Sequence, residues 1–200
     1  MKSRGKQLAC VLLCASTLAV VQAASQAPAI DATLLAKANA GDASAQIAVG
    51  VSYAKAAAVE HDRTQIASDY KQAAERYRKA ADQNNVAGKV HLAALYRDGG
   101  HGFSRDMEQA AVWYRKAAKQ GDVGAQGTLG VLYSMGQDVP HDVEAYFWFD
   151  VAASVKGPNQ EKYVANGQMI GMRITADELA DMEDRVAAWK AAHPRPDASN

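Results

Sequence analysis

Apolar side chains recur every four residues along much of the chain, and this periodicity predicts α-helices. In three segments the recurring set is a small residue, then valine or leucine, then tyrosine: Ala45, Val49 and Tyr53; Gly88, Leu92 and Tyr96; Ala125, Leu129 and Tyr133. Residues four apart lie on one face of a helix, so each set forms an apolar stripe. The tyrosines are spaced 43 and 37 residues apart. Helical patterns repeated at such intervals are typical of solenoids built from helical hairpins.

A second helix is predicted after each of these first helices. We call the first helix of each pair the A helix and the second the B helix. The B helices end in paired alanines at 80–81, 117–118 and 152–153. The middle B helix shows its apolar face most clearly, at Ala110, Trp113, Tyr114 and Ala117. Each pair is therefore expected to form a hairpin.

Polar turn residues mark where the predicted helices begin. Asp42, Asn85 and Asp122 stand where the N-caps of the A helices belong. The loops over 98–106 and 136–142 end in Asp106 and Asp142, which are expected to cap the B helices that follow.

Small residues inside the A helices predict close packing. Gly50, Ala93 and Gly130 occupy matched positions. A glycine within a helix costs about 1 kcal/mol relative to alanine. Its recurrence therefore indicates that another helix crosses closely at these points.

The two ends of the array differ from its repeated middle. Asp31 is expected to cap a short helix over 32–40. After a break at 157–158, one more helix of the A type is predicted over 159–174. Thr175 and Glu178 then form a capping box that begins a helix running to about residue 192. Four of its residues are expected to face inward: Leu179, Met182, Val186 and Trp189.

The first 23 residues have the features of a secretory signal peptide. Basic residues are followed by a short apolar run over 8–21, and Ala23 ends a small-x-small cleavage pattern. We expect cleavage after Ala23 and a periplasmic or secreted protein. A lipid anchor at Cys14 is the alternative, but Leu13 precedes that cysteine where lipoprotein processing requires a small residue. No second apolar run is long enough to span a bilayer, so no membrane insertion is expected after cleavage.

Cysteine use and charge narrow the possible partners. Cys10 and Cys14 both lie in the signal peptide, so the exported chain is expected to form no disulfide. The whole chain has 22 basic and 22 acidic side chains. Removal of residues 1–23 leaves a formal charge of −3, because three basic and no acidic side chains are lost. This balance argues against a nucleic-acid partner.

The repeats resemble the Sel1-like repeat family, which is related in architecture to TPR proteins. The resemblance rests on Gly-Asp-x-x-Ala-Gln, Leu-Gly-x-x-Tyr, an aromatic pair and a closing Ala-Ala; residues 123–153 carry nearly all of it. The middle copy departs from the pattern at Asn84 and Asn85, and the first has Ala56 and Arg76 where glycine and tryptophan are expected. The resemblance covers about 38–153. It implies an all-α, right-handed superhelix of helical hairpins that binds another protein or peptide without a cofactor.

The expected organisation of the chain follows from these observations. It comprises a signal peptide over 1–23, a flexible leader over 24–31 and a repeat array over 32–154. Two capping helices over 155–192 and a disordered tail over 193–200 complete it.

Two serine motifs keep an enzymatic alternative open. Ser52 and Lys55, and Ser68 and Lys71, have the Ser-x-x-Lys spacing that brings an amine near a hydroxyl on a helix. Some secreted relatives with cysteine-rich repeats are credited with binding or hydrolysing β-lactams, a function that the resemblance would allow here. The accompanying Ser-Asp-Asn and Lys-Thr-Gly motifs are absent from the sequence, which favours a non-catalytic protein.

No metal or phosphate site is predicted. The five histidines form no pair four residues apart, so they lack ligand spacing. The glycine-rich segment over 99–102 follows no predicted strand and is interpreted as a hairpin turn.

The A helices are expected to line the concave side of the superhelix. Positions there that vary among the copies are not needed for stacking, and we predict that they form a partner-binding groove. The predicted groove residues are Ser44, Ile47, Ala48, Val51, Ala87, Lys89, Val90, His91, Ala94, Gly124, Gln126, Gly127, Thr128 and Val131. Family analogy adds a further alternative, an immunity protein that masks a toxin in the periplasm.

Overall fold

The computed structural model describes residues 28–99, 104–135 and 141–194, and these residues form nine α-helices and no β-strand. The helices are α2 (Ala32–Asn39), α3 (Ala43–Val59), α4 (Arg63–Asp82), α5 (Val86–Asp98), α6 (Met107–Ala118), α7 (Val123–Ser134), α8 (Asp142–Ala153), α9 (Gln160–Gly171) and α10 (Ala176–Ala192). The predicted signal peptide, half of the predicted leader (24–27) and most of the predicted tail (195–200) lie outside the described residues.

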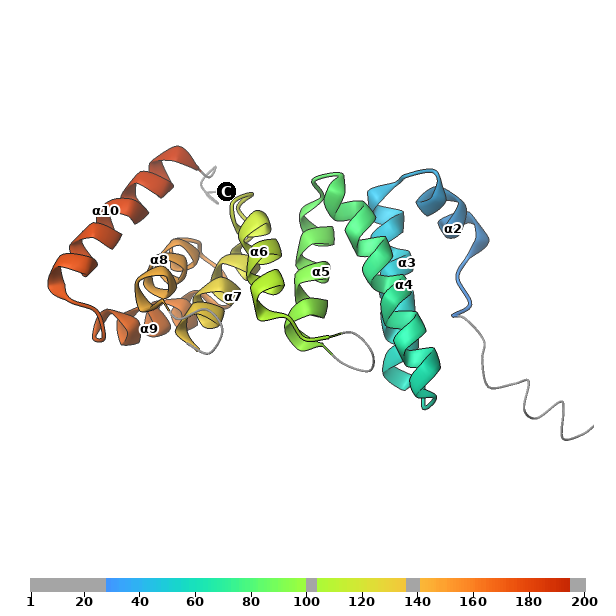
Figure 1. Cartoon of the computed structure of the whole chain (residues 1–200). Coiled ribbons are helices and arrows are strands. Elements are labelled where there is room, and N and C mark those ends of the chain that lie inside the picture. The colour runs from blue at the N-terminus through green and yellow to red at the C-terminus, as the bar shows by residue number, and fades with distance from the viewer. Residues whose placement is uncertain (1–27, 100–103, 136–140, 195–200) are drawn as a thin grey trace, which may run out of the picture.

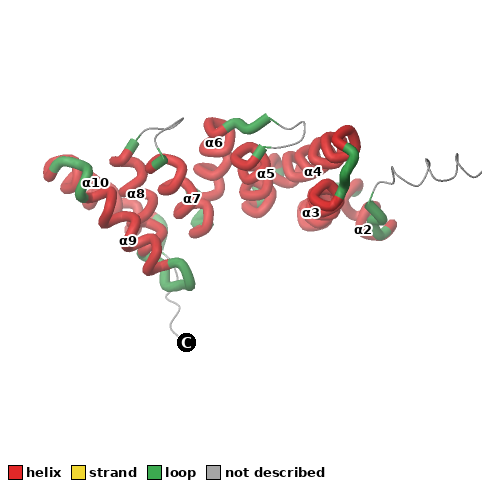
Figure 2. Tube along the Cα trace, turned by 90° about the horizontal axis from the view of Figure 1, so that it is seen from below, coloured by secondary structure: helices red, strands yellow, loops and turns green. Residues whose placement is uncertain are grey.

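Successive hairpins stack along the molecule in chain order. Figure 1 shows α2 at one end and α10 at the other, with the remaining helices between them in sequence. The view from below keeps the same order (Figure 2). Nearly all helix–helix contacts join neighbours in the chain, and the packing of α10 on α8 is the main exception. The predicted all-α superhelix of helical hairpins is confirmed.

The predicted N-caps fix where the A helices begin. The Oδ1 atoms of Asp42 and Asp122 each accept a hydrogen bond at 2.7 Å from the backbone N–H three residues on, and Asn85 accepts one at 3.1 Å. Asp106 caps α6 in the same way at 2.9 Å. The prediction for Asp142 is wrong, because α8 begins at Asp142 itself and its carboxylate instead pairs with Arg173 at 3.0 Å.

The predicted close crossings occur at two glycines. A Cβ atom on Gly50 would lie 2.6 Å from the Tyr77 ring, and one on Gly130 would lie 2.6 Å from the Phe149 ring. Both rings are buried. The missing side chain lets each aromatic ring of the B helix lie directly on the backbone of its A helix. Burial also raises the pKa of Tyr77 to about 12.

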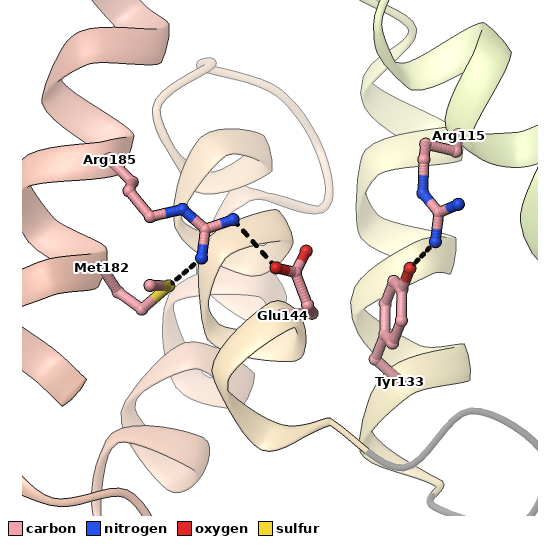
Figure 3. Close-up of polar contacts among 5 residues, drawn as sticks. All are labelled: Arg115, Tyr133, Glu144, Met182 and Arg185. Atoms are coloured by element: carbon pink, nitrogen blue, oxygen red, sulfur yellow. Dashed lines mark hydrogen bonds and ion pairs between the residues drawn. The ribbon is translucent and has the colours of Figure 1, made fainter.

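The first two hairpins, α3–α4 and α5–α6, are each joined to the next hairpin by an arginine and a tyrosine. Arg78 of α4 donates to the hydroxyl of Tyr96 in α5 at 2.6 Å. Arg115 of α6 donates to Tyr133 of α7 in the same way (Figure 3). The guanidinium of Arg115 also lies 5.8 Å from the centre of the Tyr133 ring. These contacts recur at matched positions, so they are part of the repeat itself.

The C-terminal helices are held by ion pairs instead. Arg185 of α10 reaches Glu144 of α8 at 2.8 Å and also donates to the sulfur of Met182 (Figure 3). Lys190 pairs with Asp150 at 3.1 Å. The predicted capping box between Thr175 and Glu178 is present.

The predicted inward face of α10 is confirmed in part. Met182 and Val186 are buried, whereas Leu179 and Trp189 are half-buried. The Trp189 ring meets that of Trp148 edge-on, with centroids 5.4 Å apart. None of the described helices combines the length and apolar character needed to cross a membrane.

Candidate protein-binding face

The predicted groove residues lie on the A helices α3, α5 and α7, and we call the surface that these helices form together with the A-type helix α9 the A-helix face. The structure divides the fourteen predicted groove residues by exposure. The exposed ones are Ser44, Ala87, Gly124 and Val131; the half-buried ones are Ile47, Ala48, Val51, Val90, His91, Ala94 and Thr128; and the buried ones are Lys89, Gln126 and Gly127. The first two groups can contact a partner, whereas the third group cannot do so without rearrangement.

Lys89 was expected to line the groove, and this expectation is wrong. Its side chain is 5% exposed. The ammonium donates to the side-chain oxygens of Asn84 and Gln120 and to the Asn84 carbonyl. Burial lowers the pKa of Lys89, and the nearby Lys116 lowers it further. Lys89 therefore links the α4–α5 turn to the end of α6 and stabilises the packing of neighbouring hairpins.

Gln126 was also expected in the groove and is fully buried. Its Nε2 donates to the Ala118 carbonyl at 3.1 Å, and Gln46 makes the same bond to Ala38 at 3.2 Å. The last turn of a helix leaves carbonyl groups without partners inside the helix. These glutamines satisfy such carbonyls where one hairpin ends and the next A helix begins, which explains their burial.

Gly127 is buried because α9 covers it. A Cβ atom on Gly127 would lie 2.2 Å from the ring of Tyr163. The position is therefore part of the contact between α7 and α9. It contributes backbone, but no side chain, to the A-helix face.

His91 is less accessible than its variable position suggested. Its ring stacks on that of Tyr77, with centroids 4.8 Å apart and planes inclined by 14°. Burial lowers the pKa of His91, so the ring is neutral at neutral pH and packs as an aromatic group.

A pocket of 550 Å³ opens on the A-helix face between the ends of α5 and α6 and the sides of α7 and α9. Three predicted residues line it, all from α7: Gly127, Thr128 and Val131. Its size lies in the range of natural ligand sites, which is about 300–1,000 Å³. The pocket thus includes three of the five predicted residues of α7 and none of those of α3 and α5.

The floor of the pocket is apolar. Val131 is 37% exposed and Met135 is 60% exposed, while Leu132 between them is buried. Met107, from the start of α6, adds a further apolar side chain. Met135 comes directly after α7, so it extends the stripe that begins at Val131.

The rim of the pocket is polar and mainly cationic. Its charged residues are Arg97, Asp98, Arg105 and Lys162. Arg97 forms a two-point contact with Asp98, at 2.7 and 3.0 Å. Asn159 and Asn166 lie on the α9 side.

Comparison with known proteins identifies the repeats. The Sel1 repeat model matches residues 43–85, 88–122 and 125–154, which is more than half of the chain. The chain belongs to the Sel1 repeat family. No curated protein matches this Sel1 repeat chain.

Two solved structures share the architecture. One is the crystal structure of a protective antigen present in uropathogenic Escherichia coli strains displaying an SLR fold, with a TM-score of 0.61 and 28% identity. That match covers 84% of this Sel1 repeat chain but only 36% of the antigen. The other is a Sel1 repeat protein from Oxalobacter formigenes, with a TM-score of 0.53 and 27% identity, covering 67% of this chain and 96% of that protein.

The sequence did not reveal the contribution of α9 to the pocket. This helix supplies Lys162 and Tyr163, which were assigned to a terminal cap. A signal was present, because 159–174 has the pattern of an A helix. Continuing the comparison of variable positions into that helix would have placed it beside the α7 residues of this Sel1 repeat array.

In the first serine motif, the hydroxyl bonds to the backbone of its own helix. The Ser52 hydroxyl donates to the Ala48 carbonyl of its own helix at 3.0 Å. Such a bond to the preceding turn is common for serine within helices. Among the residues that the structure describes, no group of three or more histidine, cysteine or acidic side chains is placed to hold a metal ion.

Proposed function

We propose that this Sel1 repeat protein is a non-catalytic scaffold that binds a segment of another protein in the pocket of its A-helix face. The observation that carries this proposal is the pocket itself, with Val131 and Met135 exposed on its floor. A concave site with a few polar groups around apolar side chains is the usual form of a binding site.

The exposure of Val131 supports the proposal because stacking does not require it. The residues of α7 that hold the array together, including Leu129 and Tyr133, are buried. Val131 instead points away from this core. Exposed apolar groups clustered in a polar rim are typical of surfaces that a partner covers.

We further propose that the protein acts in the periplasm or outside the cell. The basic start, the apolar run over 8–21 and the cleavage pattern ending at Ala23 support export. Amino-terminal sequencing of the mature protein is expected to begin at Ala24. A mature chain that retains residues 1–23 would contradict export by this route.

Binding in the pocket is tested by two matched valine variants. Val131 in the pocket and Val112 on α6 are 37% and 38% exposed, and both lie in helices. Val131→Glu places a charge on the pocket floor and is expected to weaken partner capture from an envelope extract by at least about tenfold. Val112→Glu is expected to leave capture unchanged. Both proteins are expected to keep the melting temperature of the wild type.

The outcome separates binding from folding. Equal capture by the two variants would refute the pocket as the binding site. A lower melting temperature for Val131→Glu alone would assign that residue to the packing of the array. Labelling by a fluorescent penicillin that disappears in Ser52→Ala would contradict the non-catalytic assignment.

A further inference from the structure

From the charges and the floor of the pocket, we infer that its occupant is an acidic segment of a partner protein that inserts one apolar side chain. This inference rests on the proposed function, because it specifies the chemistry of the partner that the same pocket binds. Ion pairs within the rim decide which of its charges a partner can bind.

Positive charge is concentrated at the rim, although the chain as a whole has no net charge. Among the residues that the structure describes, three cations and one carboxylate line the pocket, and together they carry a formal charge of +2, whereas the whole chain is neutral. Charge complementarity across an interface selects partners and speeds their association. A segment rich in aspartate and glutamate is the chemistry that this rim favours.

Two of the three cations are available to a partner. Arg97 is held by Asp98 and lies 5.9 Å from the centre of the Tyr114 ring. Arg105 and Lys162 form no ion pair with any residue that the structure describes. They come from opposite sides of the pocket, since one precedes α6 and the other lies on α9.

The position of Arg105 is fixed by the backbone around it. Gly99 has a φ of +62°, and a Cβ atom there would lie 2.7 Å from Cβ of Arg105. The N–H of Asp106 also donates to the Tyr96 carbonyl at 2.8 Å. These contacts hold Arg105 close to the end of α5 and therefore near Arg97 on the same rim.

The floor specifies the remaining part of the occupant. Val131 and Met135 are exposed apolar residues that line the pocket, and methionine side chains adapt to apolar groups of different shapes. Asn159 makes no capping bond at the start of α9, so its amide remains available to the backbone of a partner. An apolar side chain flanked by acidic residues matches both the floor and the rim.

A second cationic hollow does not share these properties and provides the control. It is lined by Lys89, Lys116 and Lys119 together with Trp113. Lys89 is buried and bonded, and Lys116 lies over the Trp113 ring at 3.8 Å. Trp113 itself is only 9% exposed, so this hollow lacks an open apolar floor. Lys119 is exposed like Lys162 and serves as its matched control.

The test selects peptides from a phage-displayed library of short random sequences on the purified protein. Enriched peptides are expected to carry several acidic residues around one apolar residue. Their affinity, measured by fluorescence polarisation, is expected to fall at least about tenfold in Lys162→Glu and in Arg105→Glu. Lys119→Glu is expected to change it less than about twofold. Raising the salt from about 0.1 M to about 1 M is expected to weaken binding to the wild type.

The possible results distinguish the partner chemistry from the proposed function. Neutral or basic peptides whose binding is lost in Val131→Glu would overturn the acidic occupant and leave the pocket as the binding site. An equal loss in Lys119→Glu and Lys162→Glu would also overturn it. If no enriched peptide is sensitive to Val131→Glu, both the acidic occupant and the proposed function fail.

Discussion

The middle of the array and its C-terminal end attach neighbouring helices by different means. In the middle, Arg78 and Arg115 each donate from a B helix to the tyrosine of the next A helix. The matched position of the last B helix is Asp150, which pairs with Lys190 of α10. One position thus carries a cation where the array continues and an anion where it stops. Terminal repeats of solenoids need such changes because nothing stacks on their outer side.

Two glycines that pack on the same phenylalanine show a related difference between these regions. Gly130 of α7 and Gly167 of α9 both contact Phe149 of α8. A Cβ atom would lie 2.6 Å from the ring at Gly130, but 3.6 Å from Cβ of Phe149 at Gly167. The crossing of α7 and α8 therefore requires a glycine, whereas that of α8 and α9 accepts a larger residue.

The largest expected effect concerns the polar contacts inside the array. Lys89→Ala removes the hydrogen bonds to Asn84 and Gln120, and we expect the free energy of unfolding to fall by about 1–3 kcal/mol. Lys89→Gln introduces the residue found at the matched positions 46 and 126. This variant is expected to lower the free energy of unfolding by less than about 1 kcal/mol. Urea denaturation followed by circular dichroism measures both. An equal loss in the two variants would contradict a polar role for Lys89.

An intermediate effect is expected at the two glycines, with opposite signs. Gly130→Ala forces the Phe149 ring to shift, and this cost exceeds the gain in helix propensity. We therefore expect the free energy of unfolding to fall by about 1 kcal/mol. Gly167→Ala meets ordinary contact distances and is expected to stabilise the protein by up to about 1 kcal/mol. Thermal denaturation of the pair tests this difference. Stabilisation by Gly130→Ala would show that the crossing has more room than the structure gives it.

The smallest effect is expected at the C-terminal ion pairs. Both partners in the pair between Lys190 and Asp150 are about two-fifths exposed, at 44% and 39%. Exposed pairs contribute about 0.2–1 kcal/mol and are screened by salt. Lys190→Met is therefore expected to lower stability by less than about 1 kcal/mol, and the difference is expected to vanish near 1 M salt. A larger loss that persists in salt would indicate that the lysine stem packs on α8.

Most of the fold could be predicted from the sequence because capping residues and apolar periodicity are visible within short segments of the chain. The capping residues Asp42, Asn85 and Asp122 and the four-residue apolar spacing determined where the A helices lie. The close helix crossings at Gly50 and Gly130 were also predictable, because a glycine inside a helix lowers stability unless close packing compensates for it.

The site was harder to predict because it depends on contacts between repeats. Variation among copies placed Lys89 and Gln126 on the surface, yet both side chains turn inward to polar atoms of neighbouring segments. The coverage of Gly127 by Tyr163 requires the position of α9, which no local pattern supplies. The variable position at Val131 does lie on the surface, where the residue is 37% exposed, and its role in binding stays a prediction.

Binding at the pocket is tested most directly by placing a photo-crosslinking amino acid at position 131 or at position 112 and illuminating the protein in an envelope extract. We predict a covalent adduct with a partner polypeptide from position 131 and none from position 112. An adduct that forms from position 112, with none from position 131, would contradict binding at the pocket of the A-helix face.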